Sequence, residues 1–179
     1  MDKIKTVSRY MQGLMIFLFV LQPIITALLC IYTDTKIGHS LWLTWIVQPQ
    51  FYVVNAKTRI LAFFVMMIET SVIMYGLYQI IKLFGAYKRG QVFMLENAIR
   101  IKKFGYAVFW LVFVNSIVSR SLMSLVLTFQ NRSIHQKMAL MFGIGSTEIY
   151  LLIFGFFVII VAWVMQEAYK LHEDQSLTV

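Results

Sequence analysis

Four apolar runs, each long enough to cross a lipid bilayer, constrain this chain more than any other feature. They lie near residues 11–32, 59–84, 105–128 and 147–168. At about 1.5 Å per residue, a helix of 22 residues measures roughly 33 Å, which spans the hydrocarbon core with modest tilt. The sequence therefore predicts an all-α polytopic membrane protein, with four transmembrane helices as two antiparallel hairpins in a single membrane domain over 1–179.

The composition supports a membrane protein and argues against a soluble one. Hydrophobic residues make up 60% of the chain and charged residues 13%, proportions that soluble domains do not have. The formal net charge of +8 is typical of nucleic-acid binders too, but the basic residues cluster beside the apolar runs. Because membrane topology accounts for such clusters, we expect contact with the lipid bilayer and no direct contact with nucleic acid.

The distribution of basic residues predicts which side of the membrane each loop occupies. The stretch from Lys82 to Lys103, which lies between the two hydrophobic halves of the chain, carries six of the sixteen basic residues, namely Lys82, Lys88, Arg89, Arg100, Lys102 and Lys103. Lysine and arginine accumulate in cytoplasmic loops. Counted over all flanks, the bias places both termini inside, with a cytoplasmic loop at 85–104 and a cytoplasmic tail at 169–179. The external loops are then 33–58 and 129–146.

Two charged residues lie within the second and third apolar runs, at similar predicted depths. Glu69 and Arg120 are each two or three residues outward of the middle of their run. A charge at mid-membrane costs about 2.5–3.5 kcal/mol on insertion scales, so an isolated charge facing lipid is unfavourable. We therefore expect Glu69 and Arg120 to pair inside the bundle. The pair is either a structural one that fixes helix register, or part of a proton or ion path.

The residues around these charges predict which helix faces point inward. On the third run a polar stripe recurs every four residues, with Asn115 and Ser119 on its shoulders; it consists of Ser116, Arg120, Ser124 and Thr128. On the second run Ala62, Glu69 and Gly76 recur every seven residues, a small-residue face suited to close helix packing.

No catalytic or metal-binding signature is present in the sequence. The chain lacks the nucleophile-elbow, zinc-protease, phosphate-loop and dinucleotide-binding patterns. His39 and His135 are both predicted to be external, but they lack metal-ligand spacing. We therefore expect no enzyme activity, no catalytic residue, no metal site and no cofactor.

The polar stretch and the tail carry a resemblance to a known family. The run GQVFMLENAIRIKK, residues 90–103, resembles the glycine-x-x-phenylalanine, glutamate-asparagine and aliphatic pattern of the bacterial membrane family called domain of unknown function 2975. The ending LHEDQSLTV, residues 171–179, resembles the charged run and leucine-threonine-valine close of that family. The resemblance implies a multi-pass protein of the bacterial inner membrane, often encoded beside small Cro-like helix-turn-helix regulators.

The matching segments predict a surface for protein binding on the cytoplasmic side. Arg89-Gly90 is expected to form a turn and Phe93 to Lys103 a short amphipathic helix at the inner leaflet. A positively charged loop with an interfacial helix is enough to explain the charges. It does not explain why the tail resembles the family. The predicted docking residues are Gly90, Phe93, Glu96, Asn97, Arg100, Ile101, Lys102, Glu173, Leu177, Thr178 and Val179.

These observations leave three classes of function open. The first is a non-enzymatic membrane protein whose loop and tail bind a partner, with a small cytoplasmic DNA-binding regulator as the candidate. The second is a homo-oligomeric channel or transporter that uses Glu69 and Arg120 in the bundle, because four helices alone leave little room for a path. The third is an immunity or defence membrane protein.

Overall fold

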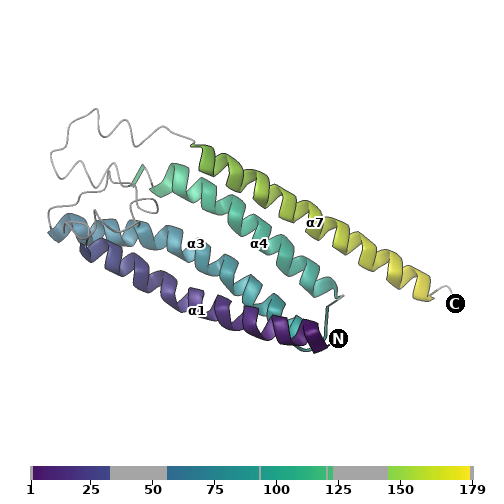
Figure 1. The fold of residues 1–179 in the computed structure, drawn as a ribbon. Coiled ribbons are helices and arrows are strands. Elements are labelled where there is room, and N and C mark those ends of the chain that lie inside the picture. Colours follow the sequence, from purple (N-terminus) through teal and green to yellow (C-terminus); the bar gives the residue numbers. More distant parts are fainter. Residues whose placement is uncertain (1, 33–55, 93, 120, 123–144, 178–179) are drawn as a thin grey trace. The chain divides into compact units, whose positions relative to one another are not determined.

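A computed structural model of the chain describes residues 2–32, 56–92, 94–119, 121–122 and 145–177, and every regular element in this part is a helix. Figure 1 labels the long helices α1, α3, α4 and α7. The elements in chain order are α1 (Asp2–Tyr32), α3 (Ala56–Lys88), α4 (Leu95–Phe113), the π-helix η2 (Val114–Ser119) and α7 (Ser146–Leu177). The expected all-α class is confirmed.

Each long helix contains a stretch that is long and apolar enough to cross a membrane. The four stretches are Lys3–Leu28, Ile60–Lys88, Leu95–Ser119 and Ser146–Leu171. The third stretch includes η2, so the chain stays helical there while its hydrogen-bond pattern changes. The structure thus confirms four apolar helices that could span a bilayer.

The chain divides into two compact units. The first unit contains Met1–Val20, Val72–Val112 and Ser146–Val179. The second unit contains Leu21–Ser71 and Phe113–Gly145.

In the first unit, α1 and α3 run antiparallel in contact with each other. A Cβ atom built at Gly90 would lie 3.5 Å from Cε of Lys5, and one built at Gly85 would lie 3.0 Å from Nε2 of Gln12. Lys5 thus lies beside Gly90, just beyond the end of α3, and Gln12, later in α1, lies beside Gly85, which comes earlier in the chain. The two helices therefore run in opposite directions. The start of α1 lies beside the connection between α3 and α4.

Helices α4 and α7 cross with their backbones in contact. A Cβ atom at Gly105 would lie 2.7 Å from Cγ1 of Ile159 and 3.2 Å from the carbonyl oxygen of Gly155. A Cβ atom at Gly155 would lie 3.3 Å from the carbonyl oxygen of Gly105 and 3.4 Å from the backbone nitrogen of Phe109. Gly105 lies beside Ile159, whereas Phe109, later in α4, lies beside Gly155, which comes earlier in α7. The two helices are therefore antiparallel, and α7 ends at the same end of the unit as the α3–α4 connection.

Alanine side chains are among the most buried in the first unit, where Leu83, Val108 and Val112 are buried as well, whereas many large apolar side chains are exposed. Ala86, Ala98, Ala107 and Ala162 are at most 5% exposed. The most exposed large side chains of α7 include Tyr150, Ile153, Phe156, Phe157 and Trp163. In a membrane the lipid solvates large apolar side chains, and small residues let helix backbones approach. This distribution is the one expected for helices packed within lipid.

The region between α3 and α4 differs from the sequence-based expectation. The short separate helix predicted over 93–103 is wrong, because α4 runs without a break from Leu95 to Phe113. Helix α3 also continues to Lys88, so the non-helical connection is much shorter than the predicted loop 85–104. The segment from Leu95 to Phe104 contains no proline or glycine that would break a helix. Its basic side chains reach polar partners or solvent while the backbone stays helical.

Candidate functional site

The connection between α3 and α4 begins with a glycine in a left-handed conformation. Gly90 has φ of 81°, which a residue without Cβ adopts at little cost. The backbone N–H of Gly90 donates to Tyr87 O at 2.9 Å, and that of Gln91 donates to Ala86 O at 3.1 Å. This pair of bonds is the Schellman motif that terminates many helices. The predicted turn at Arg89-Gly90 is confirmed.

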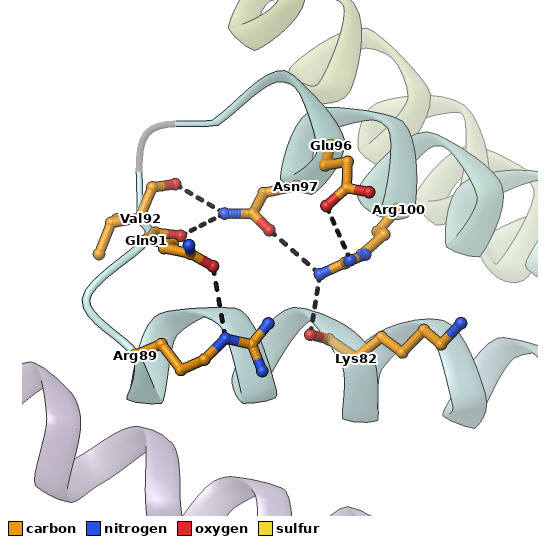
Figure 2. A network of polar contacts seen from close by, with 7 residues as sticks. All are labelled: Lys82, Arg89, Gln91, Val92, Glu96, Asn97 and Arg100. Atoms are coloured by element: carbon orange, nitrogen blue, oxygen red, sulfur yellow. Dashed lines mark hydrogen bonds and ion pairs between the residues drawn. The ribbon is translucent and has the colours of Figure 1, made fainter.

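A buried asparagine closes the connection from the other side. Asn97, in the first turn of α4, is 1% exposed and is the largest fully buried side chain of the described residues. Its Nδ2 donates to Gln91 O at 2.6 Å and to Val92 O at 3.0 Å, as Figure 2 shows. These carbonyl groups lie outside either helix and have no helical donor of their own. Asn97 therefore fixes the path of the connection.

An arginine joins α4 to the end of α3. Nη1 of Arg100 donates to Lys82 O at 3.0 Å and to Asn97 Oδ1 at 3.4 Å, and Nη2 donates to Glu96 Oε2 at 3.0 Å (Figure 2). The Arg100 side chain is 16% exposed, whereas that of Glu96 is 74% exposed. The bond to the Lys82 carbonyl is the one that connects the two helices, because Glu96 and Asn97 lie on α4 together with Arg100. Exposed ion pairs such as Arg100–Glu96 contribute about 0–1 kcal/mol.

The structure separates the predicted docking residues into two groups. Gly90, Asn97 and Arg100 build the connection itself, so their types are explained by local structure. Glu96 and Glu173 are exposed, and Ile101 and Lys102 are half-buried. Phe93, Thr178 and Val179 lie outside the described residues; Leu177 ends α7, and its side chain is likewise outside them.

A second polar cluster lies in the second unit, within the apolar stretches. Nδ2 of Asn115 donates to Oε1 of Glu69 at 2.8 Å, joining η2 to α3. The partner predicted for Glu69, Arg120, lies outside the described residues, and so do Ser124 and Thr128. The Glu69–Arg120 pair stays a prediction. In the sequence, Asn115 lies only on the shoulder of the polar stripe, and no sequence signal marks it as a partner of Glu69.

Hydroxyl groups in this unit differ between α-helical and π-helical backbone. In α-helices, Ser71 Oγ donates to Met67 O at 2.7 Å and Thr26 Oγ1 donates to Gln22 O at 3.1 Å. Thr26 Oγ1 also lies 2.9 Å from Thr70 Oγ1. In η2, by contrast, the buried Oγ atoms of Ser116 and Ser119 have no hydrogen-bond partner among the residues that the structure describes.

The π-helix offers a reason for this difference. Its hydrogen bonds run from residue i to i−5, so the carbonyl four residues back is displaced from its α-helical position. A serine hydroxyl that would donate to that carbonyl in an α-helix loses its local acceptor. Among the described residues, the second unit thus contains the Ser116 and Ser119 hydroxyl groups without partners and the Glu69 carboxylate that accepts a hydrogen bond from Asn115.

Among the described residues, no group of three or more histidine, cysteine, aspartate or glutamate side chains is arranged to hold a metal ion. His39 and His135 lie outside these residues. Within the described part of the chain, the polar chemistry is therefore that of hydrogen bonds and single charges.

Comparison with known proteins supplies the family but no further relative. No curated protein and no solved structure matches the chain. The model of the family described as "Protein of unknown function (DUF2975)" matches residues 8–179, nearly the whole chain. The resemblance noted in the polar stretch and the tail is thereby confirmed, and the chain belongs to this family.

Proposed function

We propose that this protein is a non-enzymatic protein of the bacterial inner membrane that binds a soluble cytoplasmic partner at one end of its first unit. The observation that carries the proposal is that three segments lie at that end of the unit. Lys5 lies against Gly90, and the antiparallel contacts of Gly105 with Gly155 and Ile159 place the end of α7 at the same end as the α3–α4 connection. The motifs over 90–103 and 171–179 belong to these segments.

The charge of this end supports a cytoplasmic location. Its basic residues come from all four helices and include Lys3, Lys5, Arg9, Lys88, Arg89, Lys102, Lys103 and Lys170. Basic residues that flank membrane spans favour the cytoplasmic side. A soluble partner in the cytoplasm is therefore the class of protein that could reach this surface.

The shape of α7 supports a docking role for its last turns. The helix has 32 residues, and at 1.5 Å per residue it measures about 48 Å, whereas the hydrocarbon core is about 30 Å thick. Its apolar stretch ends at Leu171, so the projecting part carries Glu173. At the start of α4, Met94, Leu95 and Ile99 are 37–45% exposed beside the exposed Lys103. Apolar side chains next to charges are typical of protein interfaces.

The partner that we propose is a small helix-turn-helix regulator held at the membrane. The support is the resemblance of the polar stretch and the tail to a family often encoded beside such regulators, and the chain belongs to that family. A regulator bound here would be kept from its DNA, and a change in the bundle would release it.

In-cell photo-crosslinking tests this function. A photoreactive residue at Glu96 or Glu173 should capture the same helix-turn-helix protein, while one at Tyr150, which is 70% exposed near the opposite end of α7, should not. Lys102→Glu should weaken the capture, and Arg100 is left intact because it holds α4 to α3. Capture of only this protein's own copies, or equal capture from all three positions, would contradict the proposal.

A second candidate function is an oligomeric channel or transporter. The observation that favours it is the hydrogen bond between Asn115 and Glu69, together with the partnerless Ser116 and Ser119 hydroxyls, in a segment of π-helix. Polar residues within membrane spans commonly mark ion or proton paths, and π-helical segments often occur at functional sites. Proton or ion flux into proteoliposomes that is abolished by Glu69→Gln with Arg120→Gln, but kept in Glu167→Gln, would support this function; flux unchanged in the double variant would exclude it.

A further inference from the structure

We propose that the start of α1 and the α3–α4 connection bind the phosphate group of an anionic phospholipid through Lys5 and Arg89. This site goes beyond the proposed function, since its ligand is a lipid and not the soluble partner. The docking residues Glu96 and Glu173 take no part in it.

Packing places two cationic residues from separate elements at one turn. The stem of Lys5 lies against Gly90, with Cε at 3.5 Å from the position of a Cβ atom built there, which is an ordinary van der Waals contact. The ammonium group of Lys5 is one bond beyond that Cε. Arg89 precedes Gly90 in the chain, so the second cationic residue belongs to the turn against which Lys5 packs.

Within the described part of the chain, neither cation has an acidic partner. Arg100 and Lys170 form ion pairs with Glu96 and Glu167, at 3.0 and 3.5 Å. Arg89, in contrast, donates only its Nε, to Gln91 Oε1 at 3.4 Å, which leaves its two terminal nitrogens available (Figure 2). Two cations at one turn without an anion repel each other, and an anion bound between them offsets that repulsion. A phosphate accepts hydrogen bonds from both groups at once.

The depth of the pair in the membrane identifies the source of the phosphate. Three apolar stretches have an end beside it: one begins at Lys3, one ends at Lys88 and one begins at Leu95. The end of a membrane span lies at the level of the lipid headgroups. A phospholipid phosphate therefore lies at this height in either leaflet, and an anionic headgroup is the charge that basic residues select there.

Lipid binding to the purified full-length protein tests the site. We expect native mass spectrometry to show retention of phosphatidylglycerol in preference to phosphatidylcholine. The double variant Lys5→Gln/Arg89→Gln should lose roughly 25-fold in affinity for phosphatidylglycerol, since each direct hydrogen bond between a cation and the phosphate contributes about fivefold or more. The control Lys57→Gln/Lys170→Gln removes the same charge from exposed positions outside the site and should change the affinity less than about twofold.

Two further measurements keep the outcome decisive. Lys5→Arg should retain the lipid, which separates loss of charge from loss of fold. Inorganic phosphate at equal concentration should not raise the thermal unfolding midpoint as phosphatidylglycerol does, and an equal rise would assign the site to free phosphate instead. Equal retention of the two lipids by the wild type, or equal loss in the two double variants, would overturn the proposal.

Discussion

The side-chain amide of Asn115 donates a 2.8 Å hydrogen bond to the carboxylate of Glu69, which ties the π-helix η2 to α3 in the second unit. Both residues lie in apolar stretches that could span a membrane. Hydrogen bonds to charged groups are stronger than neutral ones, and a low dielectric strengthens them further. This bond gives η2 a specific partner in the bundle.

A double-mutant cycle should measure the coupling between these two residues. Asn115→Leu is expected to lower the free energy of unfolding by about 1.5–3 kcal/mol, because the carboxylate loses a donor. Combining it with Glu69→Leu should cost less than the sum of the single changes, with a coupling of about 1 kcal/mol or more. Ser71→Ala, which alters an exposed hydroxyl of α3, should change stability by less than about 0.5 kcal/mol. Additive effects in the cycle would contradict the bond.

Asn97 should be the most sensitive polar position of the α3–α4 connection. In Asn97→Ala the carbonyl groups of Gln91 and Val92 lose their donor, which should cost about 1–3 kcal/mol of unfolding free energy. Glu96→Ala removes only the exposed ion pair with Arg100 and should cost at most about 1 kcal/mol. Thermal unfolding in detergent micelles, followed by circular dichroism, compares the two variants. Equal unfolding midpoints would show that the buried amide does not fix the connection.

Replacement of glycine by alanine should lower the free energy of unfolding at Gly105 in α4 but not at Gly13 in α1. Gly105→Ala places a Cβ atom 2.7 Å from Ile159 and against the backbone of α7, so it should destabilise by about 1–3 kcal/mol. Gly13 has nothing within 4 Å of a built Cβ atom, so Gly13→Ala should be neutral or stabilising by up to about 1 kcal/mol. Chemical unfolding of both variants in micelles measures the difference. A loss in Gly13→Ala as large as that in Gly105→Ala would contradict the close crossing of α4 and α7.

The parts of the fold that the sequence predicts are those governed by local signals. Apolar runs of membrane length predict the four helices, and Arg89-Gly90 predicts the turn where α3 ends. Both signals depend on a few adjacent residues and on the lipid environment, so no tertiary contact is needed to recognise them.

Features that depend on tertiary contacts were not predictable in the same way. The charges near Arg100 suggested a separate surface helix, yet Arg100 donates to the Lys82 carbonyl on another helix, and α4 continues through this region. Asn97 has a polar side chain of the kind that is usually exposed, but it is buried, because it donates hydrogen bonds to backbone carbonyl groups of the connection. The π-helix changes the face on which Asn115 lies relative to an α-helix, so a period of 3.6 residues does not describe this segment.

The hydroxyl groups of Ser116 and Ser119 should reveal whether the π-helix is a structural feature or a functional one. A buried polar atom without a partner destabilises the folded state, so Ser116→Ala and Ser119→Ala should each raise the free energy of unfolding, by about 1 kcal/mol. Thr26→Val should instead lower it, by a similar amount, because the contact with Thr70 is lost. Unfolding in micelles, with Ser71→Ala as the α-helical control, gives the three comparisons. Loss of stability in the two η2 variants would contradict this prediction and would mean that bound water or an ion satisfies these hydroxyls in the folded protein, which favours the transport function.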